Sequence, residues 1–452
     1  MKGPLHVKLK LLIILILLNL LPSCASKPIG GDIIFNDYKP NYETEVDFST
    51  PDKVRQQIKK IGNLNNPENQ RKFIKVLIAF YNITRTDQQG ILFPARTKTT
   101  LKFNSFCASS KKAIPTQNEI FQWVQGLPDI QLIKQIIPLI NLSQLDAPTA
   151  QTLIWNLENR THYEDYPENL KKFLNKADRN AKFILPSRLR TQIIDEILPQ
   201  EIKDAKSLVT GQYYEFAAYK ERIESLRSKE KLPTNYFASR IPKTPILALT
   251  TSHDFESQTI TFINPENTSQ RIAVSDYFLN PVRSDVQPII LASTMPPLDE
   301  IQKILEEFSL KLLGYMASQY PTLNDSEKTL VKKYPIQSAI VFYNAMIAEN
   351  NAEKLYPQSG VNGKADAFRH YVWSGLITRD LNESSAREFL NAHEQNPRQP
   401  RIEKEMDEFN NELGIIAAKS LLNTGSFENE KLFQKASNEI INGNLRILNN
   451  EK

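Results

Sequence analysis

The stretch from Gly363 to Ala418 most constrains what this chain can fold into, because it places polar side chains inside otherwise apolar runs. The apolar spacing predicts a helix over residues 365–381 that is apolar on most sides, and such a helix is usually buried. Asp366 and His370 are one helical turn apart, so they lie on the same face and can touch. A buried carboxylate needs a partner, so we expect Asp366 to pair with His370, Arg369 or a metal ion.

Two further helices are predicted in the same stretch. The first begins at Asn382 or Ser384 and carries His393 on its apolar stripe, with Glu394 directly after it. A linker with two prolines follows. The expected core face of the last helix is Met406, Phe409, Leu413 and Ile416. A neighbouring polar stripe is formed by Asp407, Asn410, Asn411 and Gly414. The glycine would let another backbone or a ligand come close.

Three runs carry a resemblance to a known family: GKADAFRHYVW (363–373), NAHE (391–394) and MDEFNNELG (406–414). In this order they resemble a bacterial domain family of unknown function. The resemblance covers about the last third of the chain. It implies an all-helical domain that recurs in secreted or surface proteins, and it implies no particular activity.

The polar residues of this region admit two interpretations. In the first, they form the centre of a metal-dependent hydrolase, in which a divalent ion acidifies a water molecule and a spare carboxylate acts as the base. The candidate catalytic residues are His370, His393, Asp366, Glu394, Asp407, Asn410 and Asn411. The candidate metal ligands are His370, His393 and Asp407, contributed by neighbouring helices as in bundle metal sites. In the second, the same groups form a hydrogen-bonded network that only holds the helices together.

The first 24 residues have the pattern of a bacterial secretion signal. Lysines precede the apolar run Leu11–Leu21, which is too short to span a bilayer comfortably. The run Leu21-Pro22-Ser23-Cys24 resembles the lipobox of bacterial lipoproteins. The resemblance implies that Cys24 is acylated and that the protein is anchored to the outer membrane, because Ala25 follows the cysteine. The alternative is an ordinary N-terminal anchor helix.

Composition and charge limit the function classes. The 452 residues, 40% of them hydrophobic, allow two or three domains with buried cores. The net charge is only +5 and the basic residues alternate with acidic ones, so nucleic-acid binding is not expected. The predicted partners are the membrane, through the lipid anchor, and an envelope component or surface protein.

We predict a mainly α fold, with two helical domains joined by a short β-rich segment after the lipoprotein signal. Residues 246–249 and 259–263 are short β-rich runs, and the stretch around 92–103 alternates as a strand does, whereas residues 117–125 and 130–140 have helical spacing. The predicted parts are a signal peptide (1–24), a flexible tether (25–50), a helical domain (51–230), a β-rich segment with a proline-rich linker (231–295) and an all-helical C-terminal domain (296–452).

Cys107 is the second feature with chemical potential, because it is the only thiol besides Cys24. The Phe-Cys pair at 106–107 and the run Gln-x-x-Ile-Trp from Gln151 to Trp155 resemble the thioester domains of bacterial surface adhesins. The resemblance implies an amine-reactive bond between Cys107 and Gln151, although a strand-rich framework between them is not expected. The alternative is a buried small thiol packed near Trp155.

The sequence therefore predicts a lipid-anchored bacterial envelope protein. If it is an enzyme, we expect a metal-dependent hydrolase of envelope material in the C-terminal domain. The alternative is a non-enzymatic surface binding or adhesion protein that uses the Cys107–Gln151 pair.

Overall fold

The structure is a computed structural model of the chain. It describes residues 33–34, 42–84, 90–109, 111–115, 119–126, 131–142, 145–188, 214–225, 238–252, 257–281, 283, 285–294, 298–317, 323–397, 399–424 and 427–448. The predicted signal peptide with Cys24, and most of the predicted tether, lie outside these residues.

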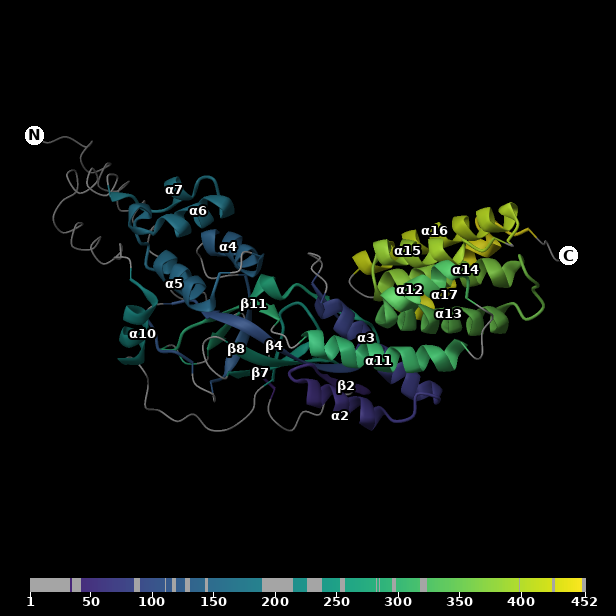
Figure 1. The fold of residues 1–452 in the computed structure, drawn as a ribbon, viewed down its shortest axis with the longest axis horizontal. Helices are drawn as coiled ribbons and strands as arrows, with labels where there is room; N and C mark the ends of the chain where they lie inside the picture. The colour runs from purple at the N-terminus through teal and green to yellow at the C-terminus, as the bar shows by residue number, and fades with distance from the viewer. Residues whose placement is uncertain are drawn as a thin grey trace, which may run out of the picture.

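A nine-stranded sheet occupies the middle of the described chain (Figure 1). Its strand order is β1-β6-β7-β8-β4-β11-β10-β5, and β2 pairs with β4. The strands are β1 (Ile33–Ile34), β2 (Thr44–Asp47), β4 (Thr97–Cys107), β5 (Phe121–Gln125), β6 (Ala238–Arg240), β7 (Leu247–Ser252), β8 (Ser257–Asn264), β10 (Tyr277–Pro281) and β11 (Ile289–Thr294). The β2–β4 pair is parallel, and the other pairs are antiparallel. A separate two-stranded sheet joins β3 (Ile91–Phe93) to β9 (Gln270–Ile272).

The long strand β4 organises the sheet. It is rich in threonine and phenylalanine, which favour a pleated, half-buried strand. It pairs with β2 and β8 in its first part and with β11 in its last part. Buried aromatic rings pack behind it, with Phe262 of β8 between Phe93, Phe103 and Trp123 at centroid distances of 4.7, 6.0 and 5.6 Å. Residues far apart in sequence therefore share one core.

The prediction of a mainly α fold with a short β segment was wrong. Strands β4 and β5 belong to the segment predicted as mainly helical, where a strand was expected only around 92–103, and β2 lies within the predicted tether, with Val46 fully buried. Residues 121–125, predicted as part of a helix, form β5 instead and pair with β10 from Tyr277 to Pro281. The pairing partner lies more than 150 residues away, so local apolar spacing did not reveal it.

Helices cover both ends of this sheet (Figure 1). At one end, a separate apolar cluster joins four helices to Phe106 of β4 and Ile290 of β11. These helices are α4 (Gln131–Leu142), α5 (Ala147–Glu158), α6 (Glu168–Ala177) and α7 (Ala181–Ile184). Residues 130–140 were predicted as helical, and α4 confirms that prediction. The short helix α10 (Phe216–Ser225) packs on α5, where the rings of Phe216 and Trp155 stack at 5.9 Å.

At the other end, two N-terminal helices join the C-terminal helices. The helix α3 contacts β2 and β3 as well as α13, and it is therefore buried on several sides. Tyr81 of α3 accepts a hydrogen bond from Asn382 at 2.8 Å. The helices of this half are α2 (Pro51–Ile61), α3 (Pro67–Thr84), α11 (Leu298–Ala317), α12 (Asp325–Lys333), α13 (Pro335–Leu355), α14 (Lys364–Asp380), α15 (Glu383–His393), α16 (Arg401–Asn423) and α17 (Asn429–Ile441). Within the described residues, none of the helices is both long and apolar enough to cross a bilayer.

The helix α14 lies at the centre of the C-terminal half and packs closely on α16. A Cβ atom added at Gly414 of α16 would lie 2.0 Å from the carbonyl oxygen of Tyr371 in α14. The two backbones can approach this closely because Gly414 has no side chain. As a result the polar stripe of α16 faces α14, whereas Ile416, predicted for the core, is 52% exposed.

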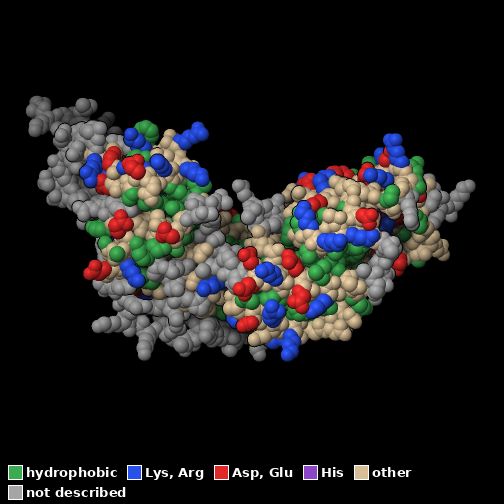
Figure 2. Space-filling view, in the orientation of Figure 1, with side chains coloured by type: hydrophobic (Ala, Val, Ile, Leu, Met, Phe, Trp, Pro, Cys, Tyr) green, Lys and Arg blue, Asp and Glu red, His purple; other side chains and the backbone are tan. Residues whose placement is uncertain are grey.

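Acidic and basic side chains are mixed on the surface of both ends of the molecule (Figure 2). On the face shown, neither sign dominates the C-terminal helices. This distribution agrees with the small net charge of +5.

Candidate functional site

His370 lies at the centre of a buried polar cluster between α14 and α16. Its side chain is 1% exposed. Nε2 of His370 lies 3.3 Å from Oδ1 of Asp407 and 3.6 Å from Oδ1 of Asp366. Nδ1 lies 3.3 Å from Oδ1 of Asn411 and 3.8 Å from Oε1 of Glu394. Four of the predicted site residues therefore surround the imidazole on both nitrogens.

Hydrogen bonds define the tautomer of His370. The amide of Asn411 donates to Oε1 of Glu394 at 3.2 Å, so its oxygen faces Nδ1 of His370. That nitrogen must then be the donor, and Nε2 carries the lone pair. Nη2 of Arg369 lies 3.0 Å from Nε2 and donates to it. The lone pair of the imidazole therefore points toward Asp366 and Asp407.

Asp366 is held at the first turn of α14. Its Oδ2 accepts a hydrogen bond from the backbone N–H of Asn362 at 3.0 Å, and its Oδ1 accepts from Nε of Arg369 at 3.1 Å and from Nη2 as well. Burial alone would raise the pKa of Asp366, but the positive charge of Arg369 lowers that pKa below its ordinary value. Asp366 is therefore an ionised member of the cluster.

The other ionisable groups are shifted toward their neutral forms. Burial, followed by the charges of Glu394 and Asp366, raises the pKa of Asp407 to about 8. Burial also raises the pKa of Glu394. The pKa of His370 lies well below its ordinary value, because the ring is buried and Arg369 is adjacent. At neutral pH Asp407 is therefore protonated beside a neutral imidazole.

Two carboxylate oxygens of the cluster lack a hydrogen-bond partner among the described residues. These buried atoms are Oδ1 of Asp407 and Oε2 of Glu394. The other oxygen of Asp407 accepts from Gln399 at 2.7 Å. Buried polar atoms are satisfied in most proteins, so these two atoms indicate a missing proton donor or cation. Asp366, His370 and Asp407 offer three metal-ligand atoms within 4.8 Å of one another.

His393 lies at the edge of this cluster. Its ring centroid is 6.1 Å from that of His370, and Trp373 packs edge-on against it at 4.9 Å. Its Nδ1 pairs with Oε1 of Glu327 in α12 at 2.7 Å, and its side chain is 35% exposed. His393 is therefore near the centre but engaged with a carboxylate outside it.

Asn410 is directed away from the cluster. Its side chain donates to the backbone carbonyl of Arg446 at 3.0 Å and accepts from the backbone N–H of Arg446 at 3.0 Å. These two bonds fix the C-terminal segment to α16. Asn410 therefore has a structural role, unlike Asn411.

Three neighbouring residues could not be identified from the sequence. Gln399 lies in the proline linker, while Glu327 and Glu349 come from α12 and α13. None of them repeats with the predicted cluster at a helical interval. Only the packing of the helices brings them to it.

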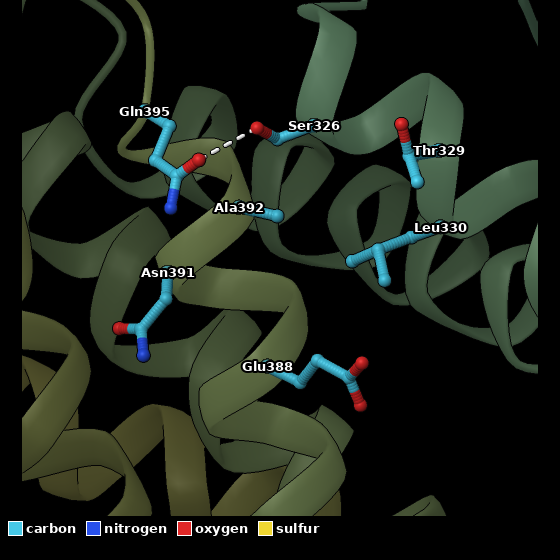
Figure 3. A pocket seen from close by; sticks show the side chains of 7 residues that line it. All are labelled: Ser326, Thr329, Leu330, Glu388, Asn391, Ala392 and Gln395. Carbon is cyan, nitrogen blue, oxygen red and sulfur yellow. Dashed lines mark hydrogen bonds between the residues drawn. The ribbon is translucent and has the colours of Figure 1, made fainter.

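A hollow of about 380 Å³ lies between α12 and α15 (Figure 3). It is lined by Ser326, Thr329, Leu330, Glu388, Asn391, Ala392 and Gln395. Ser326 donates to Gln395 at 2.6 Å across it. None of these residues belongs to the buried cluster, so the hollow is not part of the candidate centre.

The structure also brings Cys107 and Gln151 together. The side-chain oxygen of Gln151 accepts from the backbone N–H of Cys107 at 2.7 Å, and its amide nitrogen donates to the carbonyl oxygen of Cys107 at 2.8 Å. Both residues are buried, and Cys107 is not in a disulfide. Between Cys107 and Gln151 the described residues form one strand, β5, and the helix α4, and Gln151 lies in α5. Trp155, one turn after Gln151, is buried in the same core.

The comparisons with known proteins concern only the C-terminal part. Residues 328–444 match the family model described as Domain of unknown function (DUF6973). This match agrees with the predicted C-terminal domain of unknown function and contains Asp366, His370, His393, Glu394 and Asp407. Neither the curated proteins nor the solved structures include a match to this chain.

Proposed function

We propose that the C-terminal helical region is the centre of a metal-dependent hydrolase, in which Asp366, His370 and Asp407 hold a divalent ion. The observation that carries this proposal is the buried Oδ1 of Asp407, which has no hydrogen-bond partner in the part of the chain that the structure describes and lies 3.3 Å from Nε2 of His370. A cation at this point would satisfy both atoms. One imidazole and two carboxylates suit zinc or manganese.

The residues around the ligands have complementary roles in this proposal. Asn411 fixes His370 in the tautomer that carries its lone pair on Nε2. Burial raises the pKa of Glu394, which favours a role for this carboxyl in taking up a proton. The ion, when bound, would supply an acidified water molecule. His393 is not a ligand in this arrangement, because Glu327 engages it.

Metal content and thermal stability test this proposal. The purified protein should contain a bound ion, and added Zn²⁺ or Mn²⁺ should raise the melting temperature. His370→Ala should abolish both effects, whereas the matched variant His393→Ala should retain them. Finding no bound ion and an unchanged melting temperature in the wild-type protein would exclude the metal site.

We also propose that the protein is exported and anchored to the outer membrane through Cys24, with envelope material as its substrate. The support is the sequence pattern of residues 1–24 alone. Labelling with a fatty-acid analogue should be lost in Cys24→Ser. Persistent labelling of that variant would contradict the lipid anchor.

A second candidate function is covalent capture of an amine by a Cys107–Gln151 thioester. The observation that favours it is the pair of hydrogen bonds that hold the Gln151 amide against Cys107. In the step, the Cys107 sulfur bonds to the side-chain carbonyl carbon of Gln151, and ammonia leaves. An amine would then replace the sulfur, which gives an amide and restores the thiol.

Intact mass distinguishes the thioester from a simple buried thiol. A thioester makes the protein lighter by one ammonia, and methylamine should add to Gln151 and leave the wild type heavier than the unmodified chain by one CH2 group. Cys107→Ala should have the plain mass with or without methylamine. A wild-type mass equal to that of the unmodified chain would exclude the bond.

A further inference from the structure

Arg369 already contacts two of the atoms that would bind the proposed metal ion. Its guanidinium donates to Oδ1 of Asp366, and its Nη2 lies 3.0 Å from Nε2 of His370. Two of the three ligand atoms are therefore engaged by a cation of the chain itself. A guanidinium is not deprotonated in proteins, so a metal ion bound here would be repelled by it at close range.

Arg369 also has a partner outside the cluster. Oε2 of Glu349 in α13 lies 3.4 Å from Nε of Arg369, and the Glu349 side chain is 42% exposed. The side chain of Arg369 is 28% exposed, whereas those of His370 and Asp407 are 1% and 6% exposed. The arginine side chain therefore extends from the buried oxygen of Asp366 and nitrogen of His370 toward solvent. If it turned toward Glu349, it would stay paired with a carboxylate and would leave these two ligand atoms free.

We infer that Arg369 is a built-in counter-ion that competes with the metal ion for Asp366 and His370 and transfers to Glu349 when the ion binds. The inference rests on the proposed metal site. The guanidinium neutralises Asp366, so this buried carboxylate already has a positively charged partner within the chain. The affinity of the site for the ion then depends on how strongly Arg369 pairs with Asp366 and His370 and how strongly it pairs with Glu349.

Titration calorimetry of the metal-stripped full chain with Mn²⁺ and Zn²⁺ tests this competition. Arg369→Gln removes the competitor and should bind the ion about tenfold more tightly than the wild type, as expected for a coupling of this kind. Glu349→Gln removes the outer partner and should bind it about tenfold more weakly. Two control variants remove a charge away from the site. They are Arg401→Gln, since the Arg401 side chain is 92% exposed, and Glu353→Gln, since Glu353 lies one turn beyond Glu349.

The outcomes separate this inference from the proposed function. If the wild type binds the ion and Arg369→Gln binds it equally well, the competition is wrong and the metal site remains. If Glu349→Gln behaves like Glu353→Gln, the transfer to Glu349 is wrong. If neither the wild type nor Arg369→Gln binds an ion, the metal site and the inference are both wrong. Should Arg369→Gln fail to fold, the two glutamate variants still decide whether the transfer occurs.

Discussion

Replacing Asp407 by asparagine should stabilise the metal-free protein, and the gain should grow with pH. The folded pKa of Asp407 is about 8, against an ordinary value of 3.8. Between these values the unfolded chain is ionised and the folded chain holds a proton. The wild-type protein therefore loses stability as pH rises from about 4 to about 8, at about 1.4 kcal/mol per pH unit. Asparagine does not titrate, so the variant avoids this loss.

The size of the expected gain in stability depends on how far pH 7 lies above the unfolded pKa of Asp407. At pH 7 the loss from Asp407 amounts to about 4 kcal/mol as an upper limit. The variant also keeps the local hydrogen bond, because its side-chain oxygen can accept from Gln399 as the carboxyl oxygen does. We therefore expect a gain of about 2 to 4 kcal/mol at pH 7 and almost none at pH 4.

Urea unfolding in the presence of a chelator, at several pH values from 4 to 8, measures this difference. Glu408→Gln is the matched control, since Glu408 is the next residue on α16 and its side chain is 48% exposed. The control should change the free energy of unfolding by little at any pH. If Asp407→Asn is destabilised by a constant amount across the range, Asp407 is ionised in the folded protein and the charge assignment is wrong.

Three further substitutions test the packing and the roles of neighbouring residues. Gly414→Ala places a Cβ atom 2.0 Å from the Tyr371 carbonyl oxygen and should cost about 3 kcal/mol, seen as a lower melting temperature; an unchanged value would contradict the close helix contact. Asn410→Ala should cost about 1–3 kcal/mol in urea unfolding without altering metal binding, because it only frees the backbone of Arg446. Asn411→Ala should weaken metal binding about tenfold in calorimetry, since it releases the His370 ring; equal affinity would refute its orienting role.

The helices that carry the candidate site could be predicted from the sequence. The helix predicted over 365–381 is observed as Lys364–Asp380, and Asn382 caps the next one by accepting from the N–H of Ser385 at 2.7 Å. The meeting of Asp366 and His370 follows from helical spacing alone. These features depend on neighbours three or four residues apart, which a sequence displays directly.

The sheet and the outer partners could not be predicted in this way. β5 has an apolar pattern that suits a helix as well as a strand, and only β10 decides between them. The pairing of His393 with Glu327 joins residues 66 positions apart and removes His393 from the ligand set. Similarly, the polar stripe of α16 faces inward because Gly414 lets α14 approach. The apolar spacing alone does not predict which face of α16 is buried.

The arrangement of the strands beside β4 has a consequence for how the chain acquires its structure. β4 ends at Cys107, but its two antiparallel neighbours begin at Ser257 and Ile289, so a ribosome must add some 150 residues or more before the ladder can close. The helices from α12 onward find most of their contacts nearby in sequence, and such segments fold quickly. We expect the last-made part of the polypeptide to reach its native form without delay, while β4 waits for both of its antiparallel neighbours to be made.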